Sequence, residues 1–181
     1  MLISILIGLA VVIAVLVVVV AMQPTDFRIT RSATISAPAA VVFAHVNDFH
    51  HWNAWSPWAR MDPAAKNSFA GAASGEGAIF SWAGNSKVGE GRMTLKESRP
   101  SELIRIKLEF LKPFQATHTA EFTFKPAGDG TLVTWSMSGK NSFMAKAVVL
   151  LMNCDKMVGG QFESGLAHLK DVTAGDMTVS Q

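Results

Sequence analysis

The chain has 181 residues, of which 17% are charged, and a formal net charge of +2. This length allows one domain of ordinary size together with an additional segment. The small net charge and the lack of a basic run in the sequence argue against nucleic acid as a partner. A single cysteine, Cys154, excludes an internal disulfide and a cysteine-rich metal site.

Residues 2–22 are the most apolar part of the chain. They carry no charge and are long enough to cross the roughly 30 Å hydrocarbon core of a bilayer as a helix. We therefore expect a retained single-pass membrane anchor. A cleaved signal peptide is the alternative, with Val19 and Ala21 as the small residues before the cut, although a basic start and a short apolar core are missing.

The side of the membrane is indicated only by the charges that follow this segment. Arg28 and Arg31 favour a cytoplasmic domain, and Asp26 beside them weakens the preference.

Much of the remaining chain alternates apolar and polar residues, which is the pattern of strands with one buried face. Turn signals such as Asp129-Gly130 separate the strand-like runs, so neighbouring strands are expected to be antiparallel. The expected strands are residues 27–36, 78–83, 88–98, 102–111, 114–125 and 131–139. Residues 61–74 are rich in turn formers and are expected to be irregular.

Helices are expected before and after the run of strands. One short helix begins at Pro38, and a second, capped by Asn47 or Asp48, ends before Pro57. A long amphipathic helix is expected from Phe143 to about Val172, with apolar residues every three or four positions. It is the helix long enough to cover the apolar side of the sheet.

Several short motifs accompany this order of elements: Ile35-Ser36-Ala37-Pro38, Trp55-Ser56-Pro57-Trp58, Gly89-Glu90-Gly91, Val133-Thr134-Trp135 and Gly165-Leu166. On these residues the chain resembles the SRPBCC (START/Bet v 1-like) superfamily, and within it membrane-anchored members of the polyketide cyclase/dehydrase and lipid-transport family. The resemblance covers residues 26–172. It implies an α+β helix-grip fold, with a curved antiparallel sheet around the C-terminal helix and an elongated apolar cavity between them.

We therefore expect a transmembrane anchor over residues 1–23, a helix-grip domain over 24–174 and a flexible tail over 175–181. The resemblance also suggests a bacterial source, and hence a bacterial inner membrane.

Residues with inward parity, or near the expected entrance, are predicted to bind the ligand: Arg31, Trp52, Trp55, Phe80, Trp82, Ile106, Leu108, His118, Trp135, Met137, Val158 and Phe162. Arg31 has two interpretations, because it can pair with an acidic headgroup or be turned outward by a bulge. His118 lies between Ala116 and Ala120 and can contact a ligand or act as acid or base; a core or rim histidine is the alternative.

Two further clusters are structural on the simplest interpretation. Trp52, Trp55 and Trp58 recur every three residues and plug the open end of the grip, or else line the entrance or enter the bilayer interface. A histidine pair, His50 and His51, lacks enough partners for a closed metal site, even with His45 and Asp48. We expect no metal and no cofactor.

The sequence thus favours a non-catalytic, membrane-tethered domain that binds a hydrophobic, lipid-like or polyketide-like small molecule. A cyclase or dehydrase using His118 and a protein-interaction module are the alternatives. The oligomeric state is left open.

Overall fold

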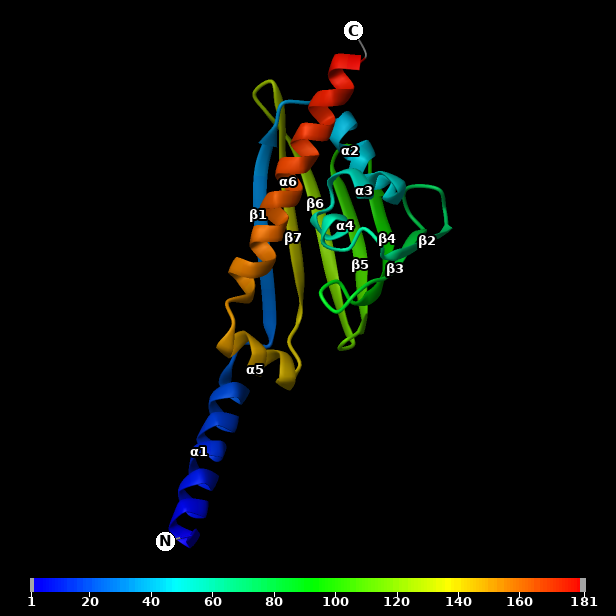
Figure 1. Cartoon of the computed structure of the whole chain (residues 1–181). Helices are drawn as coiled ribbons and strands as arrows, with labels where there is room; N and C mark the ends of the chain where they lie inside the picture. The colour runs from blue at the N-terminus through cyan, green and yellow to red at the C-terminus, as the bar shows by residue number, and fades with distance from the viewer. Residues whose placement is uncertain (1, 180–181) are drawn as a thin grey trace.

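The computed structural model describes residues 2–179 of the chain. It contains one antiparallel sheet of seven strands in the order β1-β7-β6-β5-β4-β3-β2 (Figure 1). The strands are β1 (Asp26–Ile35), β2 (Lys66–Gly71), β3 (Ala78–Ala83), β4 (Glu90–Arg99), β5 (Leu103–Lys112), β6 (Ala116–Ala127) and β7 (Gly130–Lys140). The helices are α1 (Leu2–Met22), α2 (Ala39–Asn47), the 3-10 helix η1 (Phe49–His51), α3 (Trp52–Trp55), α4 (Pro57–Met61), α5 (Phe143–Leu151) and α6 (Cys154–Val179).

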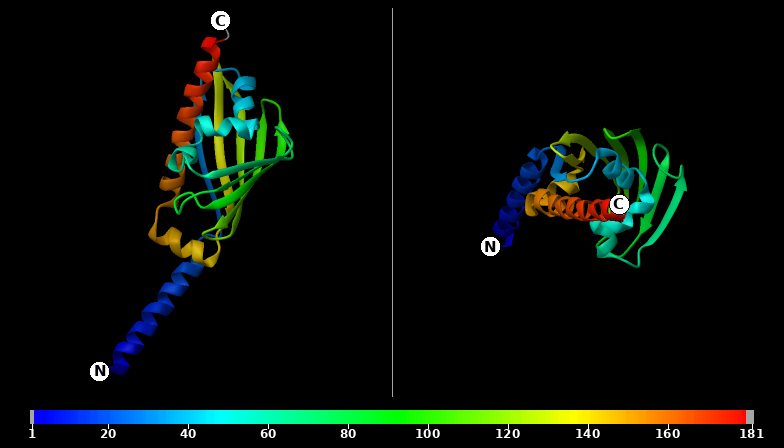
Figure 2. Two further views of the ribbon diagram at one scale, coloured as in Figure 1. Left: turned by 45° about the vertical axis from the view of Figure 1, so that its right-hand side comes forward. Right: turned by 90° about the horizontal axis from the view of Figure 1, so that it is seen from above.

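The sheet curves around α6. Seen from above, α6 lies in the hollow of the sheet, against β1 and beside the short helices α2, α3 and α4 (Figure 2). This is the predicted helix-grip arrangement, and the prediction of the fold class is confirmed.

The six predicted strands are confirmed as β1 and β3–β7, with the expected faces. Inward-facing Ile104, Ile106 and Phe122 are buried. Outward-facing residues form cross-strand ion pairs, such as Arg105 Nη2 with Glu121 Oε2 at 2.9 Å.

Strand β2 was not predicted, because it lies within residues 61–74, which were expected to be irregular. All six of its residues are exposed, so it has no alternation of buried and exposed positions. It pairs with β3 at the edge of the sheet. An edge strand without a buried face leaves no periodic signal in a sequence.

The prediction of one continuous helix from Phe143 to Val172 is wrong, since the helix is interrupted between α5 and α6. The side chain of Asn153 accepts a hydrogen bond from the backbone N–H of Lys156 at 2.9 Å. Asn153 therefore caps a new helix instead of continuing the old one. The apolar residues of α5 do not extend the buried stripe of α6, and Phe143 is 48% exposed.

The two terminal helices point to opposite ends of the molecule (Figure 1). Helix α1 is long and apolar enough to cross a membrane, a test that a signal sequence would also pass. Helix α6 continues to Val179, so the predicted tail, residues 175–181, begins inside this helix. Residues 180 and 181 lie outside the described part of the chain.

Stacked aromatic rings connect the sheet to α6. Trp135 of β7 lies between Phe122 of β6 and Phe162 of α6, at centroid distances of 4.7 and 4.2 Å. Trp52 and Trp55 of α3 contact this stack edge-on. All five side chains are buried. Stacked and edge-on rings each add about 0.5–1.5 kcal/mol to the gain from burial.

Gly165 allows α6 to approach this stack. A Cβ atom on Gly165 would lie 2.8 Å from Cζ3 of Trp135 and 3.1 Å from Cδ of Pro57. A Cβ atom on Gly160, in the same helix, would meet nothing within 4 Å. Packing therefore requires glycine at position 165 and not at position 160.

We expect Gly165→Ala to lower the free energy of unfolding by about 1–3 kcal/mol, because α6 or the Trp135 ring must move. The matched substitution Gly160→Ala should raise it by up to about 1 kcal/mol, since alanine is the better helix former. Chemical denaturation of the full chain in detergent, followed by tryptophan fluorescence, measures both. The same effect from both substitutions would contradict the close approach at Gly165.

Candidate functional site

The apolar face of the sheet is buried at one end and half-buried at the other. The register places Leu95, Ile106 and Ala120 in one row across three strands, and all three are buried. The next row, on the side of α1, contains Leu108 and His118, which are both half-buried. Apolar side chains at this end reach solvent without any opening of the core.

His118 is at the centre of the half-buried end. Its ring contacts those of Phe27 and Phe110, at centroid distances of 4.9 and 5.6 Å. It also packs on Gly139, where a Cβ atom would lie 2.5 Å from its Cδ2. The missing side chain of Gly139 thus provides the space for the imidazole.

Nδ1 of His118 is buried and has no hydrogen-bond partner among the described residues. Burial lowers the pKa of His118 below its ordinary value, because the charged imidazolium loses hydration there. The imidazole is therefore neutral at pH 7. Its Nδ1 can donate or accept one hydrogen bond, depending on the tautomer.

Trp82 and Phe80 of β3 also lie at this end of the sheet. The ring of Trp82 occupies the space left by Gly91, where a Cβ atom would overlap it. Its Nε1 donates a hydrogen bond to the carbonyl oxygen of Val88 at 3.3 Å, and its ring stacks with that of Phe80 at 6.1 Å. Both side chains are half-buried and present aromatic surface.

The structure divides the predicted ligand-binding residues into two groups. Phe80, Trp82, Leu108 and His118 lie at the half-buried end. The closed core and α6 contain Trp52, Trp55, Ile106, Trp135, Met137 and Phe162, which are buried, and Val158, which is half-buried. Their side chains occupy much of the space between sheet and α6 where the resemblance implies an elongated cavity.

Burial also decides between the interpretations of the tryptophans. Trp52 and Trp55 are 4% and 0% exposed, so they pack the core and cannot enter a bilayer interface. Trp58 is half-buried and contacts the rings of Trp135 and Phe162.

Arg31, the remaining predicted residue, is bound to α6. Its Nε donates to Oε1 of Glu163 at 2.6 Å, and its Nη2 to Oδ2 of Asp155 at 3.0 Å. The hydrogen bonds with Asp155 and Glu163 raise the pKa of Arg31, and the one from Arg31 lowers the pKa of Asp155. A Cβ atom on Gly159 would overlap the guanidinium, so a larger residue there would require the end of the Arg31 side chain to move.

The outward bulge considered for Arg31 is not formed. Over the described residues 26–35, β1 pairs with β7 in an unbroken register, with Arg31 opposite Trp135.

Of the four residues considered for a metal, His50 pairs with Asp48 and His45 pairs with a residue of α6. Nδ1 of His50 lies 2.8 Å from Oδ1 of Asp48, and the same oxygen accepts the backbone N–H of His50 at 2.9 Å. Nε2 of His45 lies 2.7 Å from Oδ2 of Asp176. Within residues 2–179, no cluster of three His, Cys, Asp or Glu residues has a geometry that could hold a metal ion.

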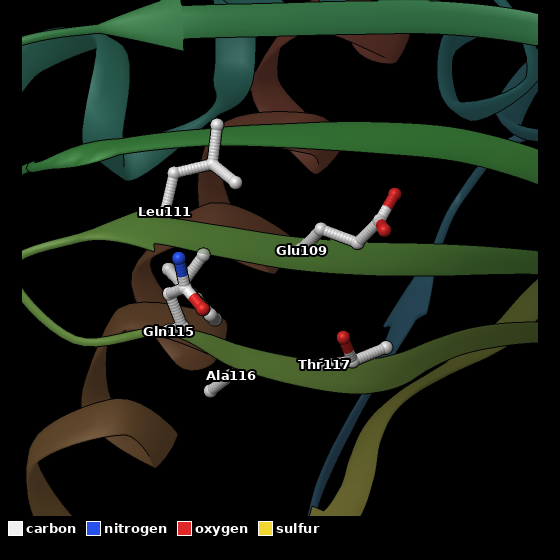
Figure 3. A pocket seen from close by; sticks show the side chains of 6 residues that line it. Glu109, Leu111, Gln115, Ala116 and Thr117 are labelled. Carbon is white, nitrogen blue, oxygen red and sulfur yellow. The ribbon is translucent and has the colours of Figure 1, made fainter.

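Two pockets are present, and the first of them shares Phe110 with the half-buried end. One, of about 390 Å³, is at the end of the β5–β6 hairpin and is lined by Glu109, Phe110, Leu111, Gln115, Ala116 and Thr117 (Figure 3). The other, of about 260 Å³, is a hollow on α1 lined by Ala14, Val15, Val18 and Val19. In the first pocket, hydrogen bonds from Lys107 and Arg92 lower the pKa of Glu109, which keeps it ionised at neutral pH.

Four residues of the half-buried end were not predicted as site residues: Phe27, Phe110, Gly91 and Gly139. Each has the inward parity of its strand, and a more specific signal is visible in the register. Gly91 is opposite Trp82 and Gly139 is opposite His118. A glycine paired with a ring leaves room for that ring to lie over the neighbouring strand.

The family model described as polyketide cyclase / dehydrase and lipid transport matches residues 26–174. This match covers most of the chain, and the chain therefore belongs to that family. Among curated proteins no match is found.

Solved structures with the same fold have low sequence identity to the chain. Protein CV1439 from Chromobacterium violaceum has a TM-score of 0.58 and 15% identity, over 83% of this chain and 98% of that chain. The di-domain ARO/CYC StfQ of the steffimycin biosynthetic pathway has a TM-score of 0.61 and 10% identity, over 85% of this chain and 52% of that chain. Ara h 8.0201 has a TM-score of 0.54 and 10% identity, over 83% of this chain and 99% of that chain.

We expect the imidazole of His118 to titrate below about pH 6.5, the ordinary histidine pKa. The unfolded chain then takes up this proton at a higher pH than the folded chain. The free energy of unfolding should therefore fall as the pH decreases below about 6.5, and this part of the slope should be absent from His118→Gln. NMR titration of the histidine rings, assigned with that variant, measures the pKa; a midpoint at or above 6.5 would contradict the burial of His118.

Proposed function

We propose that the protein is a membrane-tethered domain that binds a hydrophobic small molecule at the half-buried end of its sheet. The observation that carries the proposal is the group of partly exposed aromatic and apolar side chains around His118, whose Nδ1 lacks a protein partner among the described residues. Burial of the apolar surface of the ligand supplies the driving force, at about 25 cal/mol per Å². A hydrogen bond with His118 orients one polar group of the ligand.

The class of ligand follows from the family. Polyketide cyclases, dehydrases and lipid transport define that family, and one protein of similar structure, StfQ, comes from the steffimycin biosynthetic pathway. These relationships support a lipid-like or polyketide-like molecule. The proposed binding domain is residues 24–174.

The proposed tether is residues 1–23, with α1 as a retained membrane span. A helix of 21 residues is about 31 Å long, which matches the hydrocarbon core of a bilayer. The preference for a cytoplasmic domain depends on Arg28 and Arg31, and both pair with carboxylates, Arg28 with Glu121 and Arg31 with two residues of α6. The proposed location is the inner membrane of a bacterium.

Catalysis of the cyclase or dehydrase type is the second candidate, and the same histidine favours it. A neutral imidazole next to a bound ligand can take up a proton as a general base. Catalytic bases are usually oriented by a third group, however, and Nδ1 of His118 has none among the described residues. Binding is therefore the first proposal.

The binding proposal predicts about one apolar molecule per chain. Native mass spectrometry of the full chain released from detergent, with organic extraction, identifies the bound molecule. Leu108→Gln should weaken its binding about tenfold or more, because an amide buried without a partner costs roughly 1–3 kcal/mol. Thr119→Gln, on the polar face of the neighbouring strand, is the matched control and should bind normally.

An empty chain that ignores lipids and polyketide-like aromatics would contradict the binding proposal. Loss of turnover with binding retained in His118→Gln would support the enzyme instead.

The tether predicts that the mature protein keeps α1. The intact mass of the protein recovered from the membrane fraction should equal that of the whole chain, and an alkaline wash should not release it. A shorter mass that begins near residue 22 would identify a cleaved signal peptide and remove the tether from the proposal.

A further inference from the structure

We infer that α5 and the turn between β5 and β6 form a second membrane contact, which enters the interfacial region of the bilayer that α1 crosses. This inference rests on the proposed retention of α1 as a membrane span. The surface, called the membrane face below, consists of Phe114, Phe143, Met144, Val148, Val149 and Leu150.

Helix α5 is apolar on all its sides, with Lys146 as its charged residue. A helix of this kind is normally buried in a protein or in lipid. Here Met144 is 65% exposed, Phe143 48% and Val148 44%. Apolar residues gathered on one surface mark a contact site.

The last turn of α1 fixes the depth of α5. Helix α5 packs against α1, and Val20, near the end of α1, is 2% exposed. Nζ of Lys146 lies 3.4 Å from the carbonyl oxygen of Ala21. If α1 spans the hydrocarbon core, its last turn lies at the boundary with the headgroups, and α5 lies at the same level.

The turn between β5 and β6 is at the same end of the sheet as α5 (Figure 1). It carries Phe114, which is 75% exposed, and follows Leu111, which is 52% exposed. An exposed aromatic ring at the tip of a hairpin, at the level of α5, can enter the interface as a second point of contact.

The charges of this surface suit lipid headgroups. Residues 141–154 contain no acidic side chain, whereas Lys146 can extend its ammonium towards phosphates while its stem stays among apolar groups. A protein covering α5 would have to displace the lipid beside the last turn of α1. The bilayer itself is therefore the occupant that fits this surface.

The test uses single-cysteine variants of the full chain in a Cys154→Ser background, labelled with the fluorophore NBD and placed in phosphatidylcholine–phosphatidylglycerol vesicles. Val148→Cys and Phe114→Cys place the label on the membrane face. Asp129→Cys places it on an exposed loop at the opposite end of the sheet. Val12→Cys, in the middle of α1, reports the span.

Labels at positions 148 and 114 should emit at shorter wavelength than the label at 129. Lipids with a nitroxide near the top of the acyl chain should quench most of their fluorescence. The label at 129 should be unaffected. Labels at 148 and 114 that match the one at 129, with position 12 still quenched by lipid, would overturn the membrane face and leave the tether intact. Loss of quenching at position 12 would instead overturn the tether.

A blue-shifted label at position 148 that lipid nitroxides do not quench would also overturn the inference, because it would show that protein covers α5. Crosslinking between chains through Val148→Cys would identify that protein as a second copy. Circular dichroism of each labelled variant verifies that the fold is retained.

Discussion

The stack of Phe122, Trp135 and Phe162 determines how the rest of the molecule is arranged. One ring from each of two strands and one from α6 lie nearly parallel, with Trp135 in the middle. The stack holds α6 over one half of the sheet and fills that half with protein side chains. The apolar surface that stays partly exposed is therefore in the other half, around His118.

Helix α6 is held by two different kinds of interaction. Near Phe162 and Gly165 it is fixed by aromatic packing at close approach. Arg31 also holds it through ion pairs with Asp155, in its first turn, and with Glu163, next to Phe162; the two carboxylate side chains are 63% and 64% exposed. Exposed ion pairs are weak and are screened by salt, whereas buried rings are not. The first turn of α6, next to α5, is held by the exposed ion pair of Asp155 and not by this stack, and it can therefore move at less cost.

The sequence was sufficient for the fold because most strands have a buried face and a polar face. Alternation at Ile104, Ile106 and Leu108 gave both the strand and its inner side. Alternation gave no signal for β2, which is exposed on both faces. Helical periodicity was misleading for the long helix, because the apolar residues of α5 follow the same spacing as those of α6 although the helix is interrupted between them. An apolar helix covered by lipid has the same composition as one covered by protein.

The candidate site could be predicted only in part. Parity placed His118 on the inner face, but parity does not show which inner residues are covered. That distinction depends on where α3 and α6 pack, and so on contacts such as Gly165 with Trp135 that join distant parts of the chain. The connection between α1 and β1 sets a further limit, since it has three residues and the carbonyl of Thr25 is bonded to the backbone N–H of Asn141 at 2.7 Å. Three residues reach about 10 Å at most. On the proposed tether, a domain held so close to α1 would diffuse in two dimensions and exchange any bound molecule with one leaflet, and delivery to a second membrane would require another carrier.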